Sequence, residues 1–105
     1  MTVKEVMQIG EKIEILIPNT PDKPAEVYYS MVQDIPSDDE IIITEPVSQG
    51  RPIALRIGSN IRVNFFRERG QYYFFAETVD RFRTEVMRLV RLKQTSRIFR
   101  LQRRN

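Results

Sequence analysis

The sequence contains no cysteine and no histidine. The absence of cysteine excludes a disulfide framework, a thiolate nucleophile and a zinc–thiolate site. The absence of histidine removes the side chain best suited to proton transfer near neutral pH, which is also the commonest metal ligand. The sequence also lacks a glycine-rich phosphate loop, so carboxylates, hydroxyls and basic groups are all that remain for chemistry. We therefore predict a protein that is not an enzyme and holds no metal or cofactor of its own.

Long apolar runs are missing as well. Residues 1–18 interleave charged side chains with the apolar ones, so they contain neither a signal-peptide core nor a segment able to cross a bilayer. With 41% hydrophobic and 30% charged residues among 105, the composition is typical of a folded domain with one core. We expect a globular domain in a reduced, cytoplasmic setting.

Charge is divided unevenly along the chain. Residues 1–80 hold eight Lys/Arg and thirteen Asp/Glu, a balance of −5, whereas residues 81–105 hold nine Lys/Arg and a single acid, a balance of +8. A basic C-terminal segment favours anionic partners such as nucleic acid, an acidic protein face, anionic lipid or a phosphorylated ligand. A solvated terminus without a specific partner is the alternative.

Up to about residue 80 the hydrophobic pattern has mostly period two, which is typical of β-strands. We expect strands at 12–17, around 27–34 and at 41–44, the last two forming a hairpin across the turn "PSDDE". The three acids of that turn, Asp38, Asp39 and Glu40, are expected to be solvated. The residues predicted to point into the core are Ile15, Val32, Ile42, Ile61, Val63, Phe74 and Val79.

Two aromatic-rich runs, residues 61–66 and 72–79, flank the charged segment "RERGQ". Gly70 can adopt the positive φ of a short loop, so the two runs predict a hairpin. Its clustered aromatic side chains are expected mainly to build the core and an interface, although they could also form a base-stacking platform. Residues 81–93 fit both a helical stripe and a strand. Short strands separated by regular turns favour an all-β domain, either a barrel or a sandwich.

The order of these features resembles one family. The stretches "IGEKIEI", "YYSMVQDI", "IIITEPV", "GRPIALRIGSNIRVNFF", "YYFFAETV" and "IFRLQRRN" together look like the N-terminal domain of YcgR-like flagellar brake proteins, which precedes a PilZ domain. The resemblance implies a small antiparallel β-barrel of about six strands, similar to a split barrel or a PilZ barrel. It also implies that residues 81–92 form a closing strand. Residues 1–93 would then be the regulatory barrel, and residues 94–105 a basic interdomain linker, the C-terminal arm, leading toward a PilZ domain beyond Asn105.

The same resemblance implies a ligand. Family members bind cyclic di-GMP between their two domains through an R-x-x-x-R motif at the entry to PilZ, and they act on a flagellar motor component. Arg104 matches the first arginine of that motif and Arg103 lies beside it, with Arg100 and Gln102 as possible supporting residues. Guanidinium groups suit this ligand because they bind phosphate in a bidentate way and stack on purines. The second arginine of the motif would fall beyond Asn105, so the chain is expected to carry only part of the site.

A small nucleic-acid-binding barrel is the alternative function. It would use the basic tail together with Phe66, Tyr72 or Tyr73 for base stacking. The acidic balance of residues 1–80 argues against it, since the barrel itself would not attract a phosphate backbone.

Overall fold

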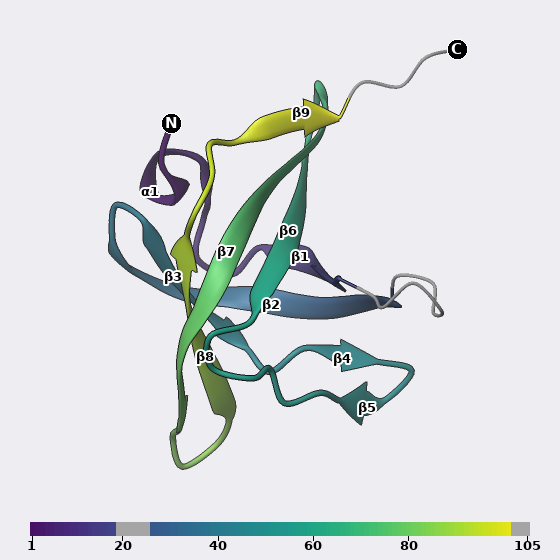
Figure 1. Ribbon diagram of the computed structural model, residues 1–105, viewed down its shortest axis with the longest axis vertical. Coiled ribbons are helices and arrows are strands. Elements are labelled where there is room, and N and C mark those ends of the chain that lie inside the picture. The colour runs from purple at the N-terminus through teal and green to yellow at the C-terminus, as the bar shows by residue number, and fades with distance from the viewer. Residues whose placement is uncertain (19–25, 102–105) are drawn as a thin grey trace.

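The computed structural model describes residues 1–18 and 26–101. It contains one helical turn and nine strands that belong to a single sheet (Figure 1). The elements are α1 (Val3–Val6), β1 (Lys12–Ile17), β2 (Glu26–Ser37), β3 (Glu40–Thr44), β4 (Val47–Ser48), β5 (Arg51–Pro52), β6 (Asn60–Arg67), β7 (Gly70–Arg83), β8 (Arg88–Gln94) and β9 (Phe99–Leu101).

Six of the strands close into an antiparallel barrel. The order of pairing is β1, β6, β7, β8, β3 and β2, and β2 pairs with β1 again to complete the ring. The predicted fold class is therefore confirmed. Closure leaves these six strands without a long open edge, which limits edge-to-edge association.

Two long strands make the corners of the barrel. β7 pairs with β6 through its first half and with β8 through its second half, and β2 passes from β1 to β3 in the same way. Register shifts occur in both strands, between Thr78 and Asp80 in β7 and on either side of Asp34 in β2. Such bulges bend a strand and increase its twist, which lets one strand serve two walls of the barrel.

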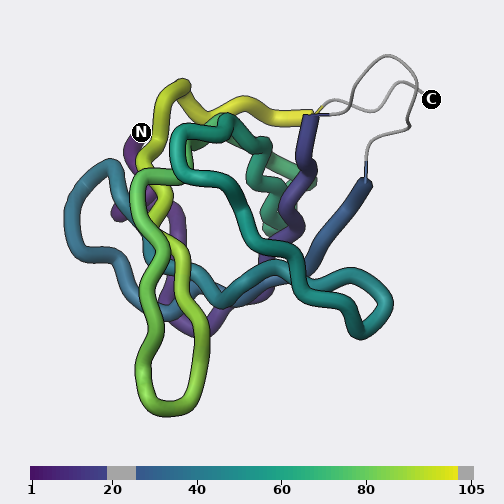
Figure 2. Tube along the Cα trace, turned by 60° about the horizontal axis from the view of Figure 1, so that its bottom comes forward, coloured from purple at the N-terminus to yellow at the C-terminus, as the bar shows by residue number. Residues whose placement is uncertain are grey.

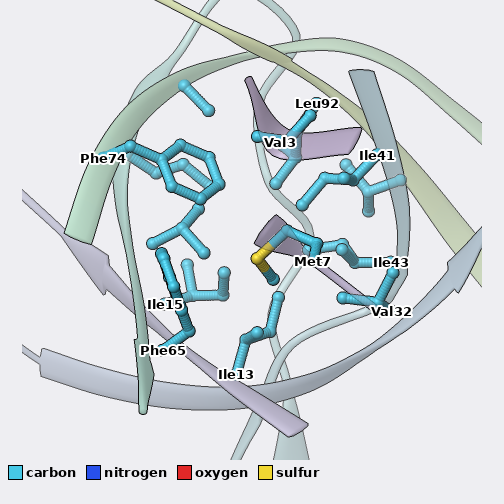
Figure 3. Packing of buried hydrophobic residues seen from close by; sticks show 14 of the residues in the cluster. Val3, Met7, Ile13, Ile15, Val32, Ile41, Ile43, Phe65, Phe74 and Leu92 are labelled. Carbon is cyan, nitrogen blue, oxygen red and sulfur yellow. The ribbon is translucent and has the colours of Figure 1, made fainter. Parts of the chain in front are cut away.

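The barrel interior is a continuous apolar core (Figure 3). Of the seven predicted core residues, Ile15, Val32, Ile61, Val63 and Phe74 belong to it, each fully enclosed. The other two predictions need correction. Ile42 is buried but lies outside the central cluster, because its neighbours on β3, Ile41 and Ile43, occupy the inward face.

Val79 is only half-buried, so this prediction was wrong. Phe74, Ala76 and Thr78 occupy alternating buried positions along β7, which places Val79 on the other side of the strand, where the register shift after Thr78 leaves it without a partner in the ladder. The Thr78 hydroxyl lies 3.2 Å from the Ser59 hydroxyl in a hydrogen bond. The partner supplied by Ser59 offsets the cost of burying a polar group there.

Residues 81–93 contain no helix. β7 continues to Arg83, residues 84–87 form a turn, and β8 returns along β7 and β3. The predicted closing strand is thus confirmed, although the turn divides the range from 81 to 92 between two strands. Val90 and Leu92 of β8 point into the core, so the strand alternation of this segment is the one the structure adopts.

The single turn of α1 covers one end of the barrel, and the sequence analysis did not anticipate it. Val3 and Met7 are buried in the core from this side (Figure 3). The Thr2 amide N–H donates a hydrogen bond to Glu5 Oε1 at 3.0 Å, and the Thr2 hydroxyl donates to the same oxygen at 3.1 Å. These bonds lower the pKa of Glu5 below its ordinary value of 4.5. Because the pKa is lowered in the folded state, the cap stabilises the fold fully at pH values above the ordinary pKa. This stabilisation is lost as the pH falls through the lowered pKa of the folded state.

Candidate binding site at the C-terminal arm

The C-terminal arm, predicted as a linker over residues 94–105, is packed on the barrel through residue 101. Leaving β8, the chain continues along the same edge of β7 and forms β9, which pairs with the first residues of β7. The register places Phe99 opposite Tyr73 and Leu101 opposite Gln71. Residues 99–101 of the predicted linker are therefore a strand of the sheet, which Figure 1 shows beside the upper part of β7.

Polar contacts fix the path between β8 and β9. The Gln94 side chain accepts a hydrogen bond from the Val3 amide at 3.0 Å and donates one to the Ser96 carbonyl at 2.7 Å. The Phe75 amide donates to Ser96 Oγ at 2.8 Å, and the Thr95 amide donates to the Phe75 carbonyl at 2.9 Å. These bonds satisfy backbone groups of the arm and orient it along β7.

An aromatic cluster holds β9 in place. The Phe99 ring stacks on Tyr73 with centroids 5.1 Å apart, and meets Phe75 edge-on at 6.4 Å. The guanidinium of Arg97 lies 4.7 Å from the Phe99 ring, and that of Arg62 lies 3.9 Å from the Tyr73 ring. Aromatic stacking and cation–π contacts of this kind stabilise a docked segment beyond the apolar area that it buries.

The arm ends beside the loop between β6 and β7. The Arg100 guanidinium donates a hydrogen bond to the Arg69 carbonyl at 2.5 Å. Its Nε lies 3.6 Å from the position that a Cβ would occupy at Gly70, so the arginine rests over the glycine. Gly70 has φ +140°, a conformation that L-residues rarely adopt, which explains why glycine suits this position of the loop.

A shallow hollow of about 620 Å³ opens at this place. Its lining consists of Phe66, Arg67, Glu68, Arg69, Gly70, Gln71, Arg100 and Leu101, which we call the arm groove. Three of these residues are arginines and one is acidic. Arg67 is engaged by Glu11 at 2.8 Å, whereas Arg69 and Arg100 form no ion pair within the described residues. The groove can therefore offer two guanidinium groups to an anion.

The predicted site residues meet this geometry in part. Arg100, predicted as a supporting residue, lies in the arm groove and is exposed. Gln102, Arg103 and Arg104 lie outside the described residues, so their predicted role stays a prediction. Arg69 was not predicted, and the hairpin signal around Gly70 was the only feature that pointed to its loop.

The predicted base-stacking platform is only partly free. Tyr72 stacks on Phe65 at 5.6 Å and packs against the core, and Tyr73 lies between Phe99 and the guanidinium of Arg62. Phe66 alone among the three predicted residues is half exposed, at 50%. Phe75 of the same hairpin is 40% exposed, but its ring meets Tyr73 and Phe99 edge-on. Little free ring surface is left for successive bases, which weighs against the nucleic-acid alternative.

Phe99→Ala is expected to release β9 without unfolding the barrel. The substitution removes the stack on Tyr73 and the edge contact with Phe75, a loss of about 1–2 kcal/mol confined to the arm. Hydrogen exchange of the β9 amides that donate to β7 should become at least about fivefold faster, while the amide of Val63 in the core keeps its protection. Leu101→Ala, at an exposed position of the same strand, is the control and should change exchange far less. Equal exchange in wild type and Phe99→Ala would show that the ring does not hold the arm.

Comparison with known proteins identifies relatives of this barrel. A family described as "PilZNR: Flagellar protein YcgR" matches residues 8–94. Among solved structures, the chain is similar to the "Structure of Bacillus subtilis Inhibitor of motility (MotI/DgrA)", with a TM-score of 0.76 and 21% sequence identity. That match covers 94% of this chain and 48% of the other, so the chain spans about half of its length. At this identity the likeness shows the fold. No curated protein matches the sequence significantly.

Proposed function

The chain belongs to the PilZNR family, described as flagellar protein YcgR, and from this premise we propose that it is a regulatory domain through which cyclic di-GMP controls motility. In this proposal the domain catalyses no reaction and works in the cytoplasm. Its partners are a PilZ domain of the same protein, cyclic di-GMP and a flagellar motor component. The arginines at the end of the arm supply one side of the dinucleotide site between the two domains.

The observation that supports this most is the docked arm. β9 fixes Arg100 beside Arg69, immediately before the positions that resemble the R-x-x-x-R motif. A phosphate-binding group that is placed before the ligand arrives costs less ordering entropy when the ligand binds. Guanidinium groups suit cyclic di-GMP in particular, because they pair with its phosphates and stack on its guanines.

None of the helical structure in residues 1–18 and 26–101 has the length and apolar character needed to cross a bilayer. Over the same residues, no three acidic side chains lie close enough together to hold a metal ion.

A motility assay tests the proposal. In the bacterium that encodes the chain, we expect a rise in cyclic di-GMP to slow swimming through soft agar, and deletion of the gene to remove most of that slowing. When the deletion strain expresses the protein with Arg103→Ala and Arg104→Ala, that protein should accumulate to the normal level but fail to restore the slowing of swimming. A deletion strain that slows as much as the wild type would contradict a role in motility control.

A further inference from the structure

The ribbon formed by the end of β7 and the start of β8 projects from the barrel (Figures 1 and 2). Its turn, residues 84–87, is held by its own hydrogen bonds. The Thr84 amide donates to the Met87 carbonyl at 2.9 Å, and the amides of Val86 and Met87 donate to Thr84 Oγ1 at 3.3 and 3.1 Å. The turn therefore presents its side chains in a fixed arrangement rather than as a loose loop.

Apolar side chains lie at the end of this projection. Val86 is 83% exposed and Met87 is 37% exposed. Ile57, which is also exposed, lines a hollow together with Arg81, Arg83 and other residues at the base of the ribbon. A single exposed aliphatic residue needs no explanation, but exposed apolar residues gathered at one prominent point mark a contact surface.

Three arginines lie directly behind the apolar tip. Arg83 pairs opposite Arg88 in the β7–β8 ladder, and Arg81 precedes Arg83 by two residues, so all three side chains leave the same face of the ribbon. Like charges directly opposite each other destabilise a strand pair. Within the described residues, Arg88 reaches Glu45 at 3.9 Å and the other two form no ion pair. An external anion between them would relieve the repulsion.

We propose that residues 81–88, the basic tip, dock on an anionic bilayer surface. Val86 and Met87 enter the boundary between headgroups and acyl chains, and Arg81, Arg83 and Arg88 lie among the lipid phosphates. Val86 and Met87 lie in the turn and the three arginines lie one step behind it, which matches the order of layers that a bilayer presents. Glu85 is exposed in the same turn, so residues 81–88, with three arginines and one acid, keep a net charge of +2. An anionic leaflet attracts each basic residue near its surface.

The size of the tip favours a lipid surface over a protein partner. A stable protein interface buries about 800 Å² on each side. One turn with two apolar side chains supplies only a fraction of that area. A bilayer surface needs no matching pocket, and weak contacts of this kind add to those made elsewhere in a protein.

The basic tip is separate from the arm groove. β9 pairs with the first residues of β7, whereas the tip begins at the last residues of the same long strand. Figure 1 shows β9 and the projecting turn at opposite ends of the view. A test of membrane docking by the tip can therefore fail while the proposed ligand binding at the arm holds, and the reverse is also true.

Vesicle sedimentation tests the inference on the 105-residue chain. We expect binding to phosphatidylcholine vesicles that contain about one third phosphatidylglycerol, and little binding to vesicles of phosphatidylcholine alone. Arg83→Glu should lower the partition coefficient for the anionic vesicles by more than roughly tenfold at low salt. Val86→Ser should lower it by about fivefold without changing the net charge.

Matched variants separate the tip from general electrostatics. Arg51→Glu makes the same change of charge on β5, outside both the tip and the arm groove, and Ile9→Ser removes another exposed aliphatic side chain outside the tip. Both should bind within about threefold of the wild type. Equal losses for Arg83→Glu and Arg51→Glu, unchanged binding of Val86→Ser, or no binding of the wild type to anionic vesicles would each overturn the proposal.

Discussion

Phe74→Ala is expected to lower the free energy of unfolding by about 3–5 kcal/mol. Phe74 is fully buried on β7, opposite Val63 of β6, and its ring lies 6.1 Å from that of Phe65. Figure 3 shows it pointing into the centre of the core. Paired strands surround the site, so the barrel cannot collapse around the missing ring and a cavity remains. The free-energy cost of this cavity adds to the cost of the buried apolar area that is lost.

Phe75→Ala is the matched control for this change. Phe75 is the next residue of the same strand but faces outward and is 40% exposed, so its loss should cost no more than about 1 kcal/mol. Urea unfolding followed by circular dichroism measures both variants. If Phe74→Ala does not fold at all, Phe74→Leu should still fold, with a cost smaller than that of the alanine variant. Equal costs for Phe74→Ala and Phe75→Ala would contradict the inward orientation of Phe74.

Replacing Arg103 and Arg104 with alanine in a protein that includes the PilZ domain should weaken cyclic di-GMP binding by about tenfold to a hundredfold. Loss of one charge-assisted phosphate contact costs roughly 1.5–3 kcal/mol, and no other group of the arm matches the motif position. The free energy of unfolding of the barrel should change by no more than about half a kcal/mol, because neither arginine is among the residues predicted to form the core. Isothermal titration calorimetry measures the affinity, and thermal unfolding measures the stability.

Arg51→Ala provides the control for that pair. Arg51 is an exposed arginine on β5, at a distance from the arm along the sheet order, so its removal lowers the charge without touching the predicted site. Its dinucleotide affinity should stay within about twofold of the wild type. Affinity that survives the double substitution would show that Arg103 and Arg104 were wrongly assigned.

Most strands of the barrel could be predicted from the sequence because each has a local pattern of apolar or aromatic residues. Alternation identified β1 and much of β2. Two aromatic-rich runs identified β6 and the first half of β7, and Gly70 between them predicted the hairpin that these two strands form. The helix-or-strand ambiguity over residues 81–93 arose because a tight turn interrupts the range, so neither period holds across it. Val79 was misplaced for a different reason, since its apolar character outweighed the period of two that leads from Phe74 and Ala76 to Thr78, a polar residue at the buried position.

The arm shows a different limit of sequence reasoning. β9 is three residues long and is held by contacts between Phe99 and residues more than twenty positions earlier, Tyr73 and Phe75. A strand this short has too few residues for a periodic signal, and its stability comes from tertiary packing. Arg69 and Arg100 could not be paired from the sequence either, because they lie far apart along the chain and only the fold brings them together.

Titration with cyclic di-GMP at physiological salt tests the central claim most directly, comparing residues 1–105 alone with the protein that includes the PilZ domain. The isolated domain is expected to bind weakly or not measurably, with GMP competing almost equally, because the proposal assigns only part of the site to these residues and the remaining attraction would be mostly screened charge. The longer protein is expected to bind tightly and selectively. Tight, selective binding by residues 1–105 alone, or no binding by the longer protein, would contradict the account.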